Sequence, residues 1–545
     1  MAEPRSLARV AMILTSYSLL FRRSSSAPAP AGTLCIPRER DALLDFKAGL
    51  TDPGNFLSSW QGADCCQWKG VKCSNGTGHV VTLRVSTGFY SPELIGGEIR
   101  PSLLTLQHLD WLDPSENDFG GKPIPEFISG LRSLTSLILS NSNFGGRIPP
   151  HIGNLSNLVN LHITNSDDLT VPQTYQLISP DLAWVSRLWK LQILDLGGVD
   201  LSAAVDWAHA LSMLPSLESI YLSFCGLQNT MPPLVHSNLT SLEFIMMSWN
   251  PFNQSIGAIN FVWNLPLPSL LGLSMMHCGF HGSIPDAVGN LTSLKELYLD
   301  ENHITGTDAI PLTLKKLKNL KVLSLTENFI NMDVGKMLDR LPSDELEMLS
   351  LDNNNLTGSL PIGIRELIKL RGLWLSSNNL HGTITEHIGE LRELESFDLS
   401  HNLLRGEIPG GLSALSALTR LNLSYTPNNL TGTIPSGNQL RTLDDQASIY
   451  IGNPGLCGPP LRRNCSGIDI TPLAPEEHEG MHDVVSIYLS MCIGFVVGLW
   501  IVFCGFLFKR KWRVMFFLFS DHMYDWVYMQ VAVGWISLAR KIRGG

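Results

Sequence analysis

The sequence predicts a repeat solenoid, in which short coils of similar length stack side by side and share one continuous core. Three apolar residues spaced i, i+3 and i+5 begin at Leu370, and the same spacing recurs from Leu394. Asn378 and Asn402 then stand at the same place in their two units. A unit of this length cannot bury its apolar residues alone, so neighbouring units must stack.

The pattern L-x-x-L-x-L-x-x-N-x-L is the leucine-rich repeat. Its leucines point into the coil, and its Asn side chain binds backbone groups that the turning loop would otherwise leave unpaired. Units begin at Leu109, Leu134, Leu158, Leu191, Leu217, Leu242, Leu270, Leu294, Leu320, Leu346, Leu370, Leu394 and Leu418. The ladder position holds Asn117, Asn250, Asn302, Asn328, Asn354, Asn378 and Asn402, and cysteine at Cys225 and Cys278.

Several units continue with G-x-I-P after the ladder position, which is typical of the plant-specific repeat. The motif stands at Gly146 to Pro149, Gly282 to Pro285, Gly406 to Pro409 and Gly432 to Pro435. Glycine allows a tight approach of backbones, and proline ends strand pairing because it has no N–H. We expect a second short strand on one flank, and an α/β-type leucine-rich-repeat solenoid that winds as a right-handed superhelix.

Length and charge restrict the class of protein. A solenoid grows in one direction and keeps a single core, so the 545 residues predict a long span rather than several globular domains. The net charge is −10 with 16% charged residues. The sequence has no basic stripe, which argues against nucleic acid as a partner.

The cysteines fall into groups that predict an extracellular chain. Because terminal repeats expose an open core end, short caps outside the cell are commonly closed by disulfides. We expect the pairs Cys35–Cys65, Cys66–Cys73 and Cys457–Cys465. We expect the ladder residues Cys225 and Cys278 to be buried thiols, with a bridge between rungs as the alternative.

The N-x-S/T sequons support the same compartment. They begin at Asn75, Asn154, Asn238, Asn253, Asn290, Asn355, Asn422, Asn429 and Asn464. None lies beyond the second cap, and this confinement fits a secreted ectodomain bearing N-linked glycans. A modest apolar run from Val10 to Phe21 follows Arg5 and Arg9, and we interpret it as a signal peptide cleaved after Ala31.

An uncharged apolar run at residues 484–508 is long enough to span a bilayer of roughly 30 Å. Acidic residues precede it and Lys509 to Lys511 follow it, so the C-terminus is expected in the cytosol and the chain is single-pass type I. The tail is too short for a kinase domain, so signalling would need a partner. The expected parts are a signal peptide (1–31), an N-terminal cysteine cap (32–80), repeats (81–440), a C-terminal cap and acidic stalk (441–483), a transmembrane helix (484–508) and a cytosolic tail (509–545).

The cap strings carry a resemblance to a known family. Residues 35–47 read CIPRERDALLDFK, residues 64–71 read DCCQWKGV, and residues 452–458 read GNPGLCG. Together they resemble plant leucine-rich-repeat receptor-like proteins, closest to the branch that contains the receptors for fungal ethylene-inducing xylanase. The resemblance implies a plasma-membrane receptor of plant defence that lacks a kinase and pairs with an adaptor receptor kinase and a co-receptor kinase.

An apolar and aromatic strip is predicted on the strand face of the repeats. The second, third, fifth, seventh and eighth positions of each unit face outward there. We expect a ligand-binding strip at Tyr221, Phe224, Phe244, Met246, Trp249, Met276, His277 and Tyr298, with Trp374 and His401 as weaker candidates. Exposed patches of this kind often mark partner sites, whereas the alternative is a tolerant surface that became apolar without a role.

Two further motifs bear on partners and chemistry. Gly494 and Gly498 form G-x-x-x-G in the apolar run, where missing side chains would let a partner helix approach closely. Residues 478–482 spell H-E-x-x-H, which on a helix can bind zinc. Here Gly480 interrupts it and no third ligand is indicated, so we interpret it as a solvated stalk. We expect a non-enzyme with no metal and no cofactor.

The favoured hypothesis is a kinase-less cell-surface receptor that recognises a microbial protein or peptide in plant defence. Other hypotheses are a developmental peptide-receptor subunit, an extracellular inhibitor of a microbial wall-degrading enzyme, and a shortened copy that does not signal. The transmembrane run counts against an inhibitor, because inhibition needs no cytosolic tail.

Overall fold

The computed structural model describes residues 35–87, 94–164, 176–228, 237–425, 428–437, 439–443, 447–461 and 463–465. All of them fall in one of the chain's two compact units, which comprises residues 1–167 and 173–465. The predicted signal peptide, the stalk with its H-E-x-x-H string, the transmembrane helix with Gly494 and Gly498, and the tail lie outside the described residues. Within these described ranges, every helix is too short or too polar to cross a bilayer.

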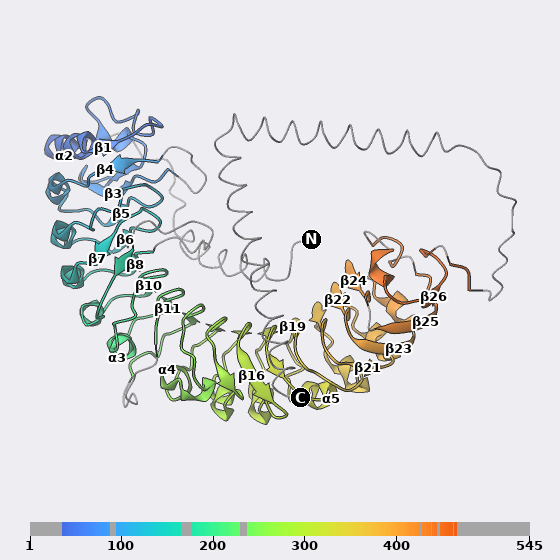
Figure 1. Ribbon diagram of the computed structural model, residues 1–545. Helices are drawn as coiled ribbons and strands as arrows, with labels where there is room; N and C mark the ends of the chain where they lie inside the picture. Colours follow the sequence, from blue (N-terminus) through green and yellow to red (C-terminus); the bar gives the residue numbers. More distant parts are fainter. Residues whose placement is uncertain are drawn as a thin grey trace, which may run out of the picture. The chain divides into compact units, whose positions relative to one another are not determined.

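A sheet of 15 strands runs through the described unit, and each coil adds one strand to it. All neighbours pair in parallel except β2 and β3, which are antiparallel. Figure 1 shows these strands on the inner side of the curved stack of coils. The strands are β2 (Val71–Cys73), β3 (Val80–Arg84), β5 (Trp111–Asp113), β6 (Ser136–Ile138), β8 (Asn160–His162), β10 (Ile193–Asp195), β11 (Ser219–Tyr221), β12 (Phe244–Met246), β13 (Gly272–Ser274), β15 (Glu296–Tyr298), β17 (Val322–Ser324), β19 (Met348–Ser350), β20 (Gly372–Trp374), β22 (Ser396–Asp398) and β24 (Arg420–Asn422).

Further short strands on the flank confirm the expectation drawn from G-x-I-P. They are β1 (Leu50–Thr51) with β4 (Gly96–Gly97), β7 (Gly146–Arg147) with β9 (Leu177–Ile178), the set β14 (His281–Gly282), β16 (His303–Gly306) and β18 (Phe329–Ile330), and the set β21 (His381–Gly382), β23 (Leu403–Glu407), β25 (Asn429–Thr433) and β26 (Gly455–Cys457). Gly406 and Gly432 have φ of 84° and 86°, a conformation that glycine adopts without strain.

The return segments are mostly single 3₁₀ turns, which complete each coil on the side away from the long sheet (Figure 1). The 3₁₀ helices are η1 (Cys65–Gln67), η2 (Pro101–Thr105), η3 (Glu126–Gly130), η4 (Pro150–Asn154), η5 (Val185–Arg187), η6 (Ile256–Ala258), η7 (Asp286–Asn290), η8 (Leu312–Lys316), η9 (Ile362–Glu366), η10 (Glu386–Glu390), η11 (Gly410–Ala414) and η12 (Ser448–Tyr450). The α-helices are α2 (Pro37–Ala48), α3 (Trp207–Ser212), α4 (Asn260–Trp263) and α5 (Val334–Leu338). In several coils the motif proline stands directly before the turn, as its N-cap residue in extended backbone, where its fixed φ is compatible with the chain.

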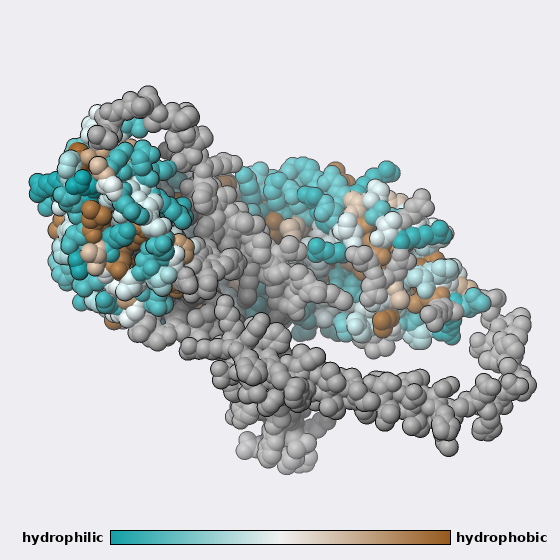
Figure 2. All heavy atoms as spheres, turned by 90° about the horizontal axis from the view of Figure 1, so that it is seen from above, coloured by the Kyte–Doolittle hydropathy of each residue, from teal (hydrophilic) through white to brown (hydrophobic). Residues whose placement is uncertain are grey.

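The core is a column of leucines closed by the predicted ladder. Oδ1 of Asn302 accepts hydrogen bonds from the backbone N–H of Cys278 and Phe280 at 3.1 and 3.0 Å. Its Nδ2 donates to the carbonyl oxygens of Met275 and Leu299 at 2.9 and 3.0 Å. One amide therefore satisfies backbone groups in its own coil and in the preceding coil. Figure 2 accordingly shows a largely hydrophilic described surface with small hydrophobic patches.

The two ladder cysteines are buried thiols, as predicted. Sγ of Cys225 donates to the carbonyl oxygen of Leu196 at 3.2 Å, and Sγ of Cys278 donates to that of Met247 at 3.3 Å. Burial raises the pKa of Cys278 to about 12, so this thiol stays protonated and inert. Asn428 and Asn453, which the repeat pattern did not predict, extend the ladder into the last coils.

Both caps close as expected. The disulfides are Cys35–Cys65, Cys66–Cys73 and Cys457–Cys465. At the first cap, the buried carboxylate of Glu39 on α2 contacts Nδ1 of His79 and the backbone N–H of Val80, both at 2.7 Å. At the other cap, β26 continues the flank sheet, and Tyr450 and Leu456 cover the last leucines.

Candidate functional site

The eighth position of the repeat has a left-handed backbone in coil after coil. Phe224, Trp249 and His277 have φ of 59°, 62° and 51°. The chain turns here from the strand toward the ladder position, and the common conformation aligns these side chains in one row. The repeat thus holds bulky residues in a conformation that they rarely adopt elsewhere.

The aligned rings form a continuous stack across three coils. The ring centroids of Phe224 and Trp249 are 5.2 Å apart, with an angle of 11° between the ring planes. Those of Trp249 and His277 are 3.9 Å apart at 20°. Nδ1 of His277 then lies 3.2 Å from Oε2 of Glu301, the residue at the same position of the next coil. Both faces of Trp249 are therefore covered within the protein, and its side chain is half-buried.

Two other aromatic residues occupy space on the sheet that glycine leaves open. A Cβ on Gly272 would stand 2.8 Å from Cδ1 of Phe244. A Cβ on Gly372 would clash with the ring of Trp374. Each ring therefore occupies the space that a side chain at the glycine position would need.

The structure places most of the predicted strip residues at the surface of the strand face. Half-buried side chains belong to Tyr221, Phe224, Phe244, Met246, Trp249, Met276 and Trp374, and His277 and His401 are exposed. Tyr298 corrects the expectation, because it is only 7% exposed. Its ring packs among the carboxylates of Glu296 and Asp300, and burial with these charges raises the pKa of Tyr298 far above its usual value. From here on, "aromatic strip" means Tyr221, Phe224, Phe244, Met246, Trp249, Met276 and His277.

Beyond the aromatic strip, the same face becomes polar, which sequence reasoning missed. Asp300 accepts from Oγ of Ser324 at 2.5 Å and from the backbone N–H of Thr326 at 2.8 Å. Asp352 accepts from the backbone N–H of Ser376 at 2.7 Å. Burial raises the pKa of Asp300 to about 6 and that of Asp352 to about 7. The signal was an aspartate at the seventh position of both units.

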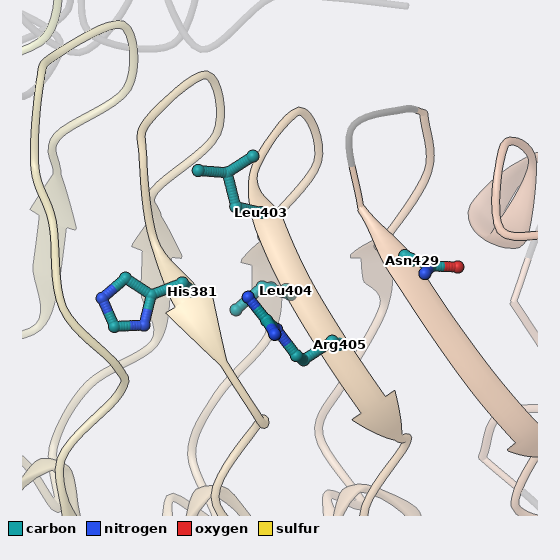
Figure 3. A pocket seen from close by; sticks show the side chains of 5 residues that line it. All are labelled: His381, Leu403, Leu404, Arg405 and Asn429. Carbon is teal, nitrogen blue, oxygen red and sulfur yellow. The ribbon is translucent and has the colours of Figure 1, made fainter.

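A shallow pocket of about 500 Å³ lies on the flank rather than on the strand face (Figure 3). It is lined by His381, Leu403, Leu404, Arg405 and Asn429, which come from β21, β23 and β25. Leu404 is buried and forms its base, whereas Leu403 is 42% exposed. Its polar side chains are one guanidinium, on Arg405, one imidazole, on His381, and one amide, on Asn429.

The predicted glycosylation sites differ in accessibility. Eight sequon asparagines are exposed, at Asn75, Asn154, Asn238, Asn253, Asn290, Asn355, Asn429 and Asn464. Asn422 lies on β24 and is half-buried. Its Nδ2 donates to Oδ2 of Asp398 at 2.9 Å, and its Oδ1 accepts from Oγ of Ser424 at 2.6 Å. A glycan there would disrupt these contacts, so Asn422 is the weakest of the nine candidates.

Comparisons with known proteins agree with the repeat pattern. Residues 36–74 match the leucine rich repeat N-terminal domain, and residues 133–155, 345–367 and 368–430 match leucine rich repeat families. Receptor-like protein EIX1 of Solanum lycopersicum is 36% identical over 54% of this chain and 29% of its own length. Receptor-like protein EIX2 of the same species is 34% identical over 63% of this chain and 33% of its own. The chain thus spans about a third of the length of these curated relatives.

One solved structure supports the fold. The plant peptide hormone receptor RGFR1, in complex with RGF2, superposes with a TM-score of 0.52 and 25% identity. The match covers 68% of this chain and 62% of the receptor chain.

Proposed function

Because the chain has leucine-rich repeats and is similar to plant receptor-like proteins, we propose that it is a cell-surface receptor. The proposed ligand is an extracellular protein or peptide that binds on the strand face. The aromatic strip is the observation that carries this proposal, since its half-exposed apolar side chains stand on a face that is polar elsewhere.

Peptide recognition has a further observation in its favour. The receptor of the superposable structure is described as a plant peptide hormone receptor with its hormone bound. A developmental peptide-receptor subunit is therefore the second candidate. The resemblance of the cap strings to the receptor-like branch for fungal ethylene-inducing xylanase favours the first candidate, in the form of a receptor for a microbial ligand in plant defence.

Relay of the signal is also a proposal. Residues 484–508 would anchor the receptor in the plasma membrane as a transmembrane helix, and an adaptor receptor kinase bound to this helix would relay the signal. The anchor and the kinase partner are both proposed from the sequence and from the resemblance to receptor-like proteins.

Differential capture tests the ligand proposal. The tagged full chain, its Met246→Glu/Met276→Glu variant and a Leu312→Glu control would each be exposed to microbial culture filtrate and to plant extracellular fluid. Leu312 is 71% exposed on η8, away from the strand face. We expect some proteins or peptides to be captured equally by the wild type and the control. The strip variant should capture at least about tenfold less of them, because a carboxylate in an apolar contact costs desolvation energy.

Equal capture by all three proteins would contradict binding on the strand face. The source of the captured ligand separates the candidates. A ligand from the microbial filtrate supports the defence receptor, and one from the plant fluid supports the developmental receptor.

A further inference from the structure

Two carboxylates stand side by side at the edge of the aromatic strip. Ser219 of β11 pairs with Phe244 of β12, so the preceding residues Glu218 and Glu243 occupy the same register on adjacent strands. Adjacent strands lie about 4.8 Å apart. Like charges directly opposite each other in a sheet are destabilising. Burial and the neighbouring Glu243 raise the pKa of Glu218, as expected for such a pair.

Glu218 and Glu243 both stand at the second position of their units, and this row of second positions carries opposite charges farther along the sheet. Nζ of Lys321 lies 2.5 Å from Oε1 of Glu347. Arg371 forms an ion pair with Glu395. In these later coils each glutamate of the row is therefore paired with a basic residue of the preceding coil. In the coils of the aromatic strip, by contrast, two glutamates follow each other.

The outward positions around the strip have the same bias. In the coils that begin at Leu191 through Leu294, these positions hold five half-buried acids, Asp195, Glu218, Glu243, Glu296 and Glu301, and the buried Asp300. The only lysine or arginine at the same positions is Lys295. An apolar surface with an acidic border is complementary to a ligand that is both apolar and basic.

We propose that the aromatic strip with Glu218 and Glu243 binds an extended peptide segment that has a lysine or arginine close to an apolar side chain. This inference rests on the proposed function and adds the chemical class of its ligand. Glu243 and Met246 are three residues apart along one strand, a separation of about 10 Å. The basic and apolar side chains of the ligand would accordingly lie within about three residues of each other.

Each part of the surface has one task. The cation lies between the two glutamates and offsets the repulsion between them, which makes this contact stronger than an ordinary exposed ion pair. The apolar side chain covers Met246 and the edges of Phe224 and Trp249, which removes apolar surface from water. Acidic ligands would be repelled from the same place.

A random peptide library tests the inference without a known ligand. Displayed 12-residue peptides would be selected on the immobilised full chain, on Glu218→Gln/Glu243→Gln, and on Glu347→Gln/Glu395→Gln. The last variant is the matched control, because it changes the same row where lysine and arginine already neutralise the glutamates. Selection on Met246→Glu/Met276→Glu identifies the peptides that depend on the strip.

We expect strip-dependent peptides with lysine or arginine enriched roughly fivefold over the starting library, as for an ion pair at a partly exposed site. This enrichment should persist in the control and vanish in Glu218→Gln/Glu243→Gln. Strip-dependent peptides that are neutral or acidic would overturn this inference and leave ligand binding on the strand face intact. If no selected peptide depended on the strip, both the inference and the proposed function would fail.

Discussion

At the scale of single residues, the ladder asparagines explain how polar backbone is tolerated inside a leucine column. Asn302 is buried and its amide satisfies groups in two coils at once. Cysteine can donate one hydrogen bond but accepts poorly, so Cys225 and Cys278 each replace only part of this pattern. The ladder asparagines of the next coils, Asn250 and Asn302, accept from the cysteine N–H groups.

Removing a ladder amide should therefore destabilise its coil locally. We expect Asn302→Ala to cost on the order of 3 kcal/mol, because several buried backbone groups lose their partners together. Hydrogen exchange at the amides of Cys278 and Phe280 is the appropriate measurement, since repeat proteins can unfold in parts. Asn319→Ala is the control, because Asn319 is exposed. Unchanged protection at both amides in Asn302→Ala would show that the ladder contributes little.

Asp352 should make stability depend on pH. Burial raises its pKa from 3.8 to about 7, so the folded chain holds this proton more tightly than the unfolded chain. The resulting stabilisation is complete below about pH 4 and is lost as the pH rises through about 7. We expect Asp352→Asn to stabilise the fold near pH 8 by on the order of 2–4 kcal/mol and so to raise its melting temperature there. Near pH 5 the effect should be much smaller.

Melting curves of the wild type, Asp352→Asn and an exposed control, Asp286→Asn, would measure this effect. The control should show no such difference between the two pH values, because Asp286 lies at the surface of η7. An equal stabilisation by Asp352→Asn at both pH values would mean that ionisation of Asp352 is not its cause.

At the scale of elements, the sequence pattern predicted the strands and the ladder because they depend on local spacing. Strand β20, its partner β22 and the G-x-I-P strand β23 all follow from residues within one coil. Helices α3, α4 and α5 did not follow, because they occupy return loops whose length varies between units. The rung at Asn428 was missed because Thr426 and Pro427 shift it out of the repeat spacing.

The site was predictable in composition but not in geometry. The outward positions follow from the repeat, and seven of the eight main strip residues reach the surface. The stack of Phe224, Trp249 and His277 could not be foreseen, because it depends on the left-handed backbone that aligns them. Since Trp249 packs between two rings, its replacement would disturb folding as well as binding, and Met246 and Met276 are better probes.

Whether the predicted transmembrane helix selects the receptor kinase partner can be tested by mutation. Gly494→Leu with Gly498→Leu would keep the segment apolar yet prevent the close approach that drives helix association in lipid. We expect the double variant to bind ligand normally while losing its co-purifying receptor kinase. Immunoprecipitation from plant membranes followed by peptide identification would measure this. Wild-type recovery of the kinase would assign the contact to the acidic residues Glu476 to Asp483 instead.

At the scale of the whole molecule, stacking converts a local pattern into a long recognition surface. Each coil contributes a few outward side chains, and the common register brings residues from distant parts of the sequence into one strip. The two disulfide-bonded caps cover the ends of the leucine column, so the described repeats form a core that is closed at both ends. A preformed face of this kind loses little conformational entropy when it binds a ligand.

Photo-crosslinking from the strip would test the central claim most directly. The full chain would carry p-benzoylphenylalanine in place of Met246, or in place of Leu312 as the control, and would be irradiated in extracellular fluid from microbe-treated plant tissue. Binding on the strand face predicts a discrete crosslinked peptide or protein from position 246 that is absent from position 312. Crosslinks from position 312 alone, or the same products from both positions, would contradict the claim that the aromatic strip binds the ligand.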